Sequence, residues 1–219
     1  MIYVGLTGGL DSMFFLIDSL RRGLEVKAIY VKDIDERQNQ DLELAFLDNL
    51  NVPVKIEEKT QYQMDLVSKW NDSVQLPSTL HLGAYAIEKG ISLNVCTVKN
   101  DHLTRHVLPS DYQPFNKMDG TRIKEGHVEY RYFKNLEFPL IYKTKSRLIK
   151  EALHNFNQEE IELLFSCVSC VVSVNGVPCG RCRSCKDNIY SGLNFFKNVR
   201  ALQNDLSDQV FENFGSNIL

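Results

Sequence analysis

Apolar residues fall into two patterns along the chain: short continuous runs, and longer stretches with a helical period. The short runs predict buried strands at residues 2–7, 25–32, 52–57, 93–98 and 136–142. The longer stretches predict helices at residues 9–22, 35–51, 80–89, 144–156, 158–164 and 188–202. Gly23 and Gly90 follow two of these helices, where glycine commonly ends a helix. Residues 99–135 show no clean period, so we expect a long irregular segment there.

Strands that alternate with helices predict a fold of the α/β class, with a parallel sheet covered by helices on both faces. In such a sheet the ligand binds outside the carboxyl ends of the strands, where the strand order reverses. The chain shows no internal repeat and no low-complexity linker. We therefore expect an α/β domain at residues 1–165 and a C-terminal extension with a helix at residues 166–219.

Composition narrows the range of partners. The chain has 219 residues, of which 43% are hydrophobic and 24% charged, and its formal net charge is −3. No basic excess favours a stable nucleic-acid partner, so a small-molecule substrate is expected. No apolar run reaches the roughly 18 residues of a membrane span. The N-terminus lacks the basic region of a signal peptide, so we expect a cytoplasmic protein with reduced thiols.

A glycine pair ends the first predicted strand and begins the first helix. The sequence there reads Thr7-Gly8-Gly9-Leu10-Asp11-Ser12. Glycines let the backbone approach an anion closely, and a helix N-terminus adds backbone N–H groups and a positive dipole end. Asp11 and Ser12 fall in the first helical turn, where they can cap the helix or reach a metal ion. The segment predicts a phosphate-binding turn, although an ordinary strand-to-helix turn remains an alternative.

The same segment differs from two familiar phosphate-binding motifs. No Gly-Lys-Ser/Thr follows it, as a Walker loop requires, and it does not read Gly-x-Gly-x-x-Gly. It resembles the Ser-Gly-Gly-x-Asp-Ser pyrophosphate loop of ATP-pyrophosphatase (PP-loop) enzymes, with Thr7 in place of the first serine. That resemblance implies that ATP binds along residues 7–12.

Five of the six cysteines lie close together near the C-terminus. They are Cys167, Cys170, Cys179, Cys182 and Cys185, and the last three form two consecutive C-x-x-C steps. This spacing lets thiolates of one tight turn bind a single Zn²⁺, with the fourth ligand supplied by Cys170 or Cys167. An iron–sulfur cluster or redox thiols are the alternatives. Cys96 falls inside an apolar strand and is expected to be a core residue.

The two signals together resemble the 7-cyano-7-deazaguanine synthase family. That family carries a Cys-x8-Cys-x-x-Cys-x-x-Cys zinc site, which Cys170, Cys179, Cys182 and Cys185 match. Leu76-Pro77 ahead of Gly83-Ala84, and Pro139-Leu140 ahead of Thr144-Lys145, also resemble segments of the family. The resemblance runs from residue 2 to about residue 196. It implies a Rossmann-like fold of the adenine nucleotide alpha hydrolase type.

The resemblance also implies a reaction. The family activates the carboxylate of 7-carboxy-7-deazaguanine with ATP, forms an amide with ammonia, and dehydrates that amide to the nitrile in a second activation. Mg²⁺ would bridge the phosphates, with Asp11 orienting the metal ion or its waters and Ser12 beside it. Lys145 would reach the phosphates from the other side of the cleft, unless it is a solvated lysine early in a helix. A homodimer is possible, since dimers are common in such folds.

Some substrate-binding segments of the family are not kept. Residues 31–37 stand where the family has Tyr-Gly-Gln-Arg-His, and residues 78–80 stand where it has Gly-Arg-Asn. The alternatives are therefore an enzyme that stops at the amide, another PP-loop adenylating enzyme such as a tRNA-thiolating one, and a nucleotide-binding pseudoenzyme. His102 and His106 remain candidates for a catalytic base.

Overall fold

The computed structural model describes residues 1–6, 9–32, 53–58, 60–69, 77–99, 101–109 and 115–165. The helices expected at 35–51 and 188–202, the cysteine cluster and the extension expected at 166–219 lie outside these residues. The strands are β1 (Ile2–Leu6), β2 (Val26–Lys32), β3 (Val54–Glu58), β4 (Leu93–Val95), β5 (Met118–Asp119), β6 (Arg122–Ile123) and β7 (Leu136–Glu137). The helices are α1 (Leu10–Arg21), α3 (Gln61–Ser68), α4 (Pro77–Lys89), α5 (His102–Val107), α6 (Tyr130–Phe133), α7 (Lys145–Asn155) and α8 (Gln158–Phe165).

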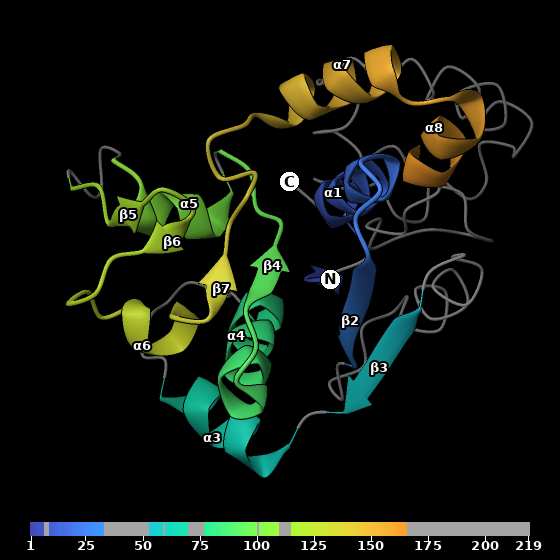
Figure 1. Ribbon diagram of the computed structural model, residues 1–219. Helices are drawn as coiled ribbons and strands as arrows, with labels where there is room; N and C mark the ends of the chain where they lie inside the picture. The colour runs from blue at the N-terminus through green and yellow to red at the C-terminus, as the bar shows by residue number, and fades with distance from the viewer. Residues whose placement is uncertain are drawn as a thin grey trace, which may run out of the picture.

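Five strands form one parallel sheet in the order β3-β2-β1-β4-β7 (Figure 1). The chain builds outward from β1 through β2 to β3, and then crosses to the other side of β1 to add β4 and β7. The strand order therefore reverses between β1 and β4, which pair with Val4 opposite Asn94 and Gly5 opposite Val95. The α/β fold class predicted from the sequence is confirmed.

Helices pack on both faces of this sheet, because successive strand residues point to opposite sides. On one face, Val4, Leu6 and Ala28 pack against α1, α7 and α8, all within one buried cluster. On the other face, Ile29 and Val95 belong to a second cluster that includes α4, α5, α6 and the β5–β6 hairpin. Figure 1 shows α7 and α8 beside α1, with α4 running along the sheet near β4.

Two helices end as their glycines predict. Gly23 has a φ of 70° after α1, and Gly90 has a φ of 63° after α4. In α1 the Gly23 N–H donates to the Leu20 carbonyl at 2.9 Å and the Leu24 N–H to the Ser19 carbonyl at 3.1 Å. This paired pattern satisfies the last carbonyl groups of the helix with a left-handed residue that glycine adopts without strain.

The structure corrects two of the predicted segments. Residues 99–135 are not an irregular stretch, because α5, the β5–β6 hairpin and α6 lie within it. The strand predicted at 136–142 pairs only over Leu136–Glu137 and then continues in turns, with the Ile141 N–H bonded to the Phe138 carbonyl at 3.2 Å. Pro139 has no N–H to donate to a strand ladder, which accounts for the early end.

Helix α3 is a further element that the sequence pattern did not predict. Thr60 caps it, accepting the Gln63 N–H at 3.3 Å, and Thr60-x-x-Gln63 has the spacing of a capping box. The Gln63 side chain is buried and donates to Glu88 on α4 at 2.7 Å. Among the described residues, no helix is long and apolar enough to cross a membrane.

Candidate functional site

The candidate site lies at the carboxyl ends of β1 and β4, where the strand order reverses. Helix α1 begins at Leu10 directly after the glycine pair, with Gly9 in extended conformation at its N-cap (φ −93°, ψ 157°). Gly9 has no side chain that can accept from the first N–H groups of the helix. By contrast, Thr60 and Thr144 cap α3 and α7 with their hydroxyl oxygens. The start of α1 therefore suits an anionic ligand, which would supply the acceptors that a capping side chain supplies elsewhere.

Ser12 and Asp11 occupy the first turn of α1, as predicted. Ser12 is buried, and its hydroxyl donates to the Gly9 carbonyl at 2.9 Å, which holds the turn in shape. The Asp11 side chain is 14% exposed, with its carboxylate 3.9 Å from the Lys145 ammonium. Thr7 and Gly8, the two remaining candidates of this loop, lie outside the described residues.

Lys145 is the first residue of α7, the helix that follows the edge strand β7, and its side chain reaches the start of α1. Its side chain is 21% exposed and faces Asp11. The segment before it is tied to the loop after β4, since the Lys99 N–H donates to the Lys143 carbonyl at 2.8 Å. The structure thus brings together Asp11 and Lys145, two candidates far apart in the sequence.

Cys96, which the sequence places in the core, also lies near Asp11 at the candidate site. It directly follows β4, is partly buried and packs against the cluster that contains α1. Burial, followed by the nearby negative charge of Asp11, raises the pKa of the Cys96 thiol well above its usual range. The thiol is therefore protonated and uncharged at neutral pH.

The loop after β4 is held by Asp101. Its carboxylate accepts the Thr97 hydroxyl at 3.1 Å and the Val98 N–H at 3.0 Å, while its carbonyl accepts the Thr104 hydroxyl at 2.7 Å. These bonds fix the loop that forms the β4 side of the site. The candidate bases His102 and His106 belong to α5, which begins directly after this loop.

The predicted metal ligands are not part of this description. Cys170, Cys179, Cys182 and Cys185 all lie beyond residue 165, where the described chain ends. Within the described residues, no group of three or more His, Cys, Asp or Glu side chains is arranged to hold a metal ion. The zinc site therefore stays a prediction from spacing and resemblance.

Strand order and site position together define a doubly wound α/β protein with its candidate site at the switch point. No protein-family model and no curated protein matches the chain. Among solved structures, the chain is similar to an NMN synthetase from Francisella tularensis, with a TM-score of 0.41 and 17% identity, covering 87% of this chain and 76% of that one. It is also similar to an NH3-dependent NAD synthetase from Campylobacter jejuni in complex with the nitrate ion. There the TM-score is 0.39 and the identity 16%, covering 74% of this chain and 66% of that one.

Proposed function

We propose that this protein is an ATP-dependent ligase that adenylates a carboxylate and joins it to ammonia. The observation that carries the proposal is the start of α1, which lies where the strand order reverses and has no capping side chain. Asp11 lies in its first turn, and the Lys145 ammonium is 3.9 Å from the Asp11 carboxylate. Support also comes from the sequence of residues 7–12, which resembles a pyrophosphate loop. That loop type belongs to enzymes that cleave ATP between its α- and β-phosphates.

The residues suggest how the chain stabilises the leaving pyrophosphate. If the pyrophosphate binds at the start of α1, the positive end of the α1 dipole and the Lys145 ammonium would both stabilise the negative charge that develops on it. In the absence of nucleotide, Asp11 and Lys145 neutralise each other across 3.9 Å. When phosphates enter, Lys145 would move to a phosphate oxygen, and Asp11 would keep its charge for a cation.

The Asp11 carboxylate fits a magnesium site of the usual kind for nucleotides. Mg²⁺ is commonly held by one or two carboxylates together with phosphate oxygens and waters, so a single protein carboxylate is sufficient. The ion, when bound, would neutralise phosphate charge during the transfer. The neutral Cys96 thiol beside Asp11 adds no competing negative charge.

The substrate we propose is 7-carboxy-7-deazaguanine, converted to the nitrile for queuosine synthesis or deazapurine modification of DNA. Its carboxylate attacks the α-phosphorus and releases pyrophosphate, and ammonia then displaces AMP to give the amide. A second ATP activates the amide oxygen, and loss of AMP with two protons leaves the nitrile. The support for this substrate is the family resemblance of the loop, of the cysteine spacing and of the Pro139-Leu140 and Thr144-Lys145 segments.

The test is the identity of the nucleotide product. With MgATP, ammonium and the deazaguanine acid, we expect AMP and pyrophosphate, measured by chromatography. The Lys145→Met variant should lose at least about 10²-fold in turnover, since it removes a charge that acts on the leaving group. Lys150→Met is the matched control, because Lys150 is exposed on the same helix. ADP as the sole product would refute adenylation, and ATP binding without any turnover would favour the pseudoenzyme.

A further inference from the structure

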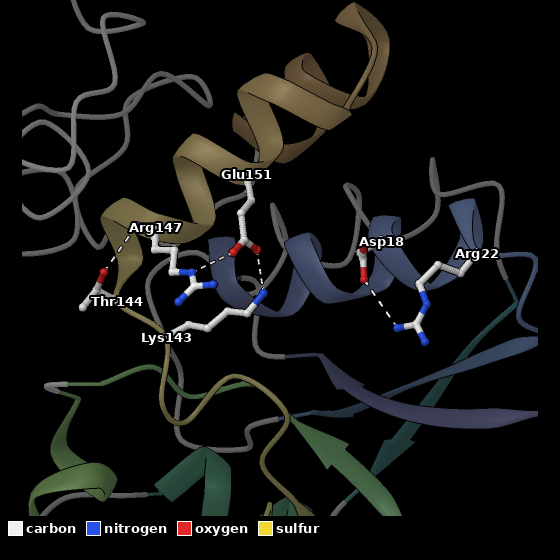
Figure 2. A network of polar contacts seen from close by, with 6 residues as sticks. All are labelled: Asp18, Arg22, Lys143, Thr144, Arg147 and Glu151. Carbon is white, nitrogen blue, oxygen red and sulfur yellow. Dashed lines mark hydrogen bonds and ion pairs between the residues drawn. The ribbon is translucent and has the colours of Figure 1, made fainter.

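Lys143 lies between the two helices that form the candidate site. Its ammonium is 5.8 Å from the centre of the Phe14 ring on α1, and it donates to the Glu151 carboxylate on α7 at 2.6 Å. Figure 2 shows its side chain running beneath α7 and pointing toward Glu151. A cation over an aromatic face is attracted to it, so Lys143 joins α1 and α7 in one contact.

The Glu151 carboxylate forms ion pairs with two cations, one at each oxygen. One oxygen accepts from Lys143, and the other accepts the Arg147 Nε–H at 2.9 Å (Figure 2). Burial alone would raise the pKa of Glu151, but the hydrogen bonds from Lys143 and Arg147 outweigh it, so the pKa is lowered. The carboxylate is therefore ionised at neutral pH and keeps both partners.

The backbone of Lys143 is held as well as its side chain. Its carbonyl accepts the Lys99 N–H from the loop after β4, and its own N–H donates to the Leu140 carbonyl at 2.8 Å. Thr144 follows as the N-cap of α7, accepting the Arg147 N–H at 3.3 Å. Lys145 comes next, so the contacts that hold residue 143 also restrict the backbone position of Lys145.

The first turn of α7 carries an arrangement that does not favour the helix by itself. Lys145 and Arg147 are cations close to the positive end of the helix dipole, where anions are the stabilising charges. Glu151 balances Arg147 and Lys143 from one turn or more further along. Of the three cations Lys143, Lys145 and Arg147, Lys145 is therefore the one that faces Asp11.

We propose that the Lys143–Glu151 ion pair positions Lys145. The pair holds the N-terminus of α7 against α1, so that the Lys145 side chain points toward the phosphates of the nucleotide. Lys143 and Glu151 act through Lys145 and need not touch the nucleotide. The proposal rests on the ATP site described above and adds two residues to it that the sequence motifs do not mark.

The first test needs no nucleotide. Lysine side chains of the folded protein are acetylated with the N-hydroxysuccinimide ester of acetic acid, and the rate at each lysine is followed by mass spectrometry. In the wild type, Lys145 should react slowly because it is partly buried beside Asp11. In Glu151→Gln its rate should rise severalfold, while the exposed Lys150 on the same helix should not change. An unchanged Lys145 rate in Glu151→Gln would overturn the positioning role.

The second test is a double-mutant cycle on MgATP affinity, measured by calorimetry. Lys143→Met should weaken binding by at least about 2-fold, the lower end of the coupling expected for residues of one network, and Lys143→Arg should restore most of the loss. In a Lys145→Met background, Lys143→Met should add almost no further loss. If the two losses instead multiply in full, Lys143 acts independently of Lys145 and the proposal is wrong.

Arg147→Gln is the matched control, since it removes the exposed partner of Glu151 and leaves Lys143 in place. It should change neither the Lys145 acetylation rate nor the MgATP affinity. The two tests also separate this proposal from the proposed function. If Lys145 labelling responds to Glu151→Gln but the wild type binds no ATP, the positioning role stands and the nucleotide site is refuted.

Discussion

Gly83, in the middle of α4, lies where no side chain fits. A methyl group added there would be 2.4 Å from the Tyr132 carbonyl oxygen and 3.2 Å from the Phe133 ring. The carbonyl belongs to the backbone of α6, so the contact can be relieved only by moving one helix away from the other. The close approach of α4 to α6 therefore depends on the absence of a side chain at a single residue.

We predict that Gly83→Ala lowers the free energy of unfolding by about 1–3 kcal/mol, the usual effect of overpacking. The gain in helix propensity from alanine is smaller and offsets only part of the loss. Urea unfolding measures the change. Lys89→Ala, at an exposed position of the same helix, should stay within about 0.5 kcal/mol of the wild type. A Gly83→Ala protein as stable as the wild type would contradict the close approach.

Glu137 gives a second prediction at this scale, on the pH dependence of stability. Its carboxylate accepts from Arg122 and, at 3.0 Å, from the Ser92 hydroxyl. The Arg122 hydrogen bond lowers the pKa of Glu137, against the opposing effect of burial. The folded pKa therefore lies below the unfolded value of about 4.3. The stabilisation is present above that value and is lost as the pH falls through the folded pKa.

Replacing Glu137 with Gln should consequently flatten the loss of stability on acidification, measured as the urea midpoint from about pH 6 to about pH 3. Glu125→Gln serves as the comparison, because Glu125 is exposed on the nearby turn. It should leave the acid limb of the curve unchanged. Equal flattening in both variants would show that the Arg122 contact has no specific effect.

At the scale of whole elements, the sequence predicted β1, β2, α1 and α4 well and predicted β7 poorly. The first group have continuous apolar runs or clear helical periods, and a glycine marks the end of both helices. Phe138 and Ile141, which follow Glu137, are equally apolar, but they are buried in a segment of turns rather than in a strand. Burial sets the apolar pattern in both cases, so the pattern alone could not separate them.

Helix α3, by contrast, is present but was not predicted from the sequence. Its only strongly buried residue is Gln63, so the helix has no apolar stripe for a periodicity search to find. The capping spacing from Thr60 to Gln63 was the local signal, and it was readable in the sequence.

The cysteine extension leads to a prediction that depends on metal rather than on packing. We expect one Zn²⁺ per chain, bound by Cys170, Cys179, Cys182 and Cys185. Cys182→Ser should release the metal and lower stability, because metal binding is coupled to folding. Elemental analysis and thermal unfolding measure both effects. Cys167→Ser is the control and should retain the metal; iron–sulfur absorption in the wild type would exclude a zinc site.

For the whole molecule, the strand order was the feature that sequence could not supply. Alternating strands and helices predict a parallel sheet, but they do not say which strands are neighbours. The strand order determines where the candidate site lies, because Asp11 and Lys145 come together only when α7 packs beside α1 at the order reversal. The motif resemblance named both residues. The Lys143–Glu151 pair and the position of Cys96 are tertiary contacts with no local signature.

At this scale the prediction concerns the product of the proposed reaction. Residues 31–37 and 78–80 depart from the family's substrate segments, while the pyrophosphate loop is largely kept. Adenylation needs a carboxylate aligned with the α-phosphorus, whereas dehydration needs the amide presented again to a second ATP, which is a stricter geometric demand. We expect the nitrile, with amide accumulating before it, as followed by mass spectrometry. No conversion of the deazaguanine acid would remove this substrate from consideration.

The return of α7 and α8 to α1 also has a consequence for the order in which the protein is made. Arg21 on α1 pairs with Glu160 on α8, 139 residues later in the chain. At roughly 5–20 residues per second, a ribosome needs about 7–28 s between these two positions. During that time the apolar face of α1 lacks the cover that α7 and α8 give it in the folded protein. The proposed nucleotide site, which includes Lys145, can therefore form only after α7 has been made.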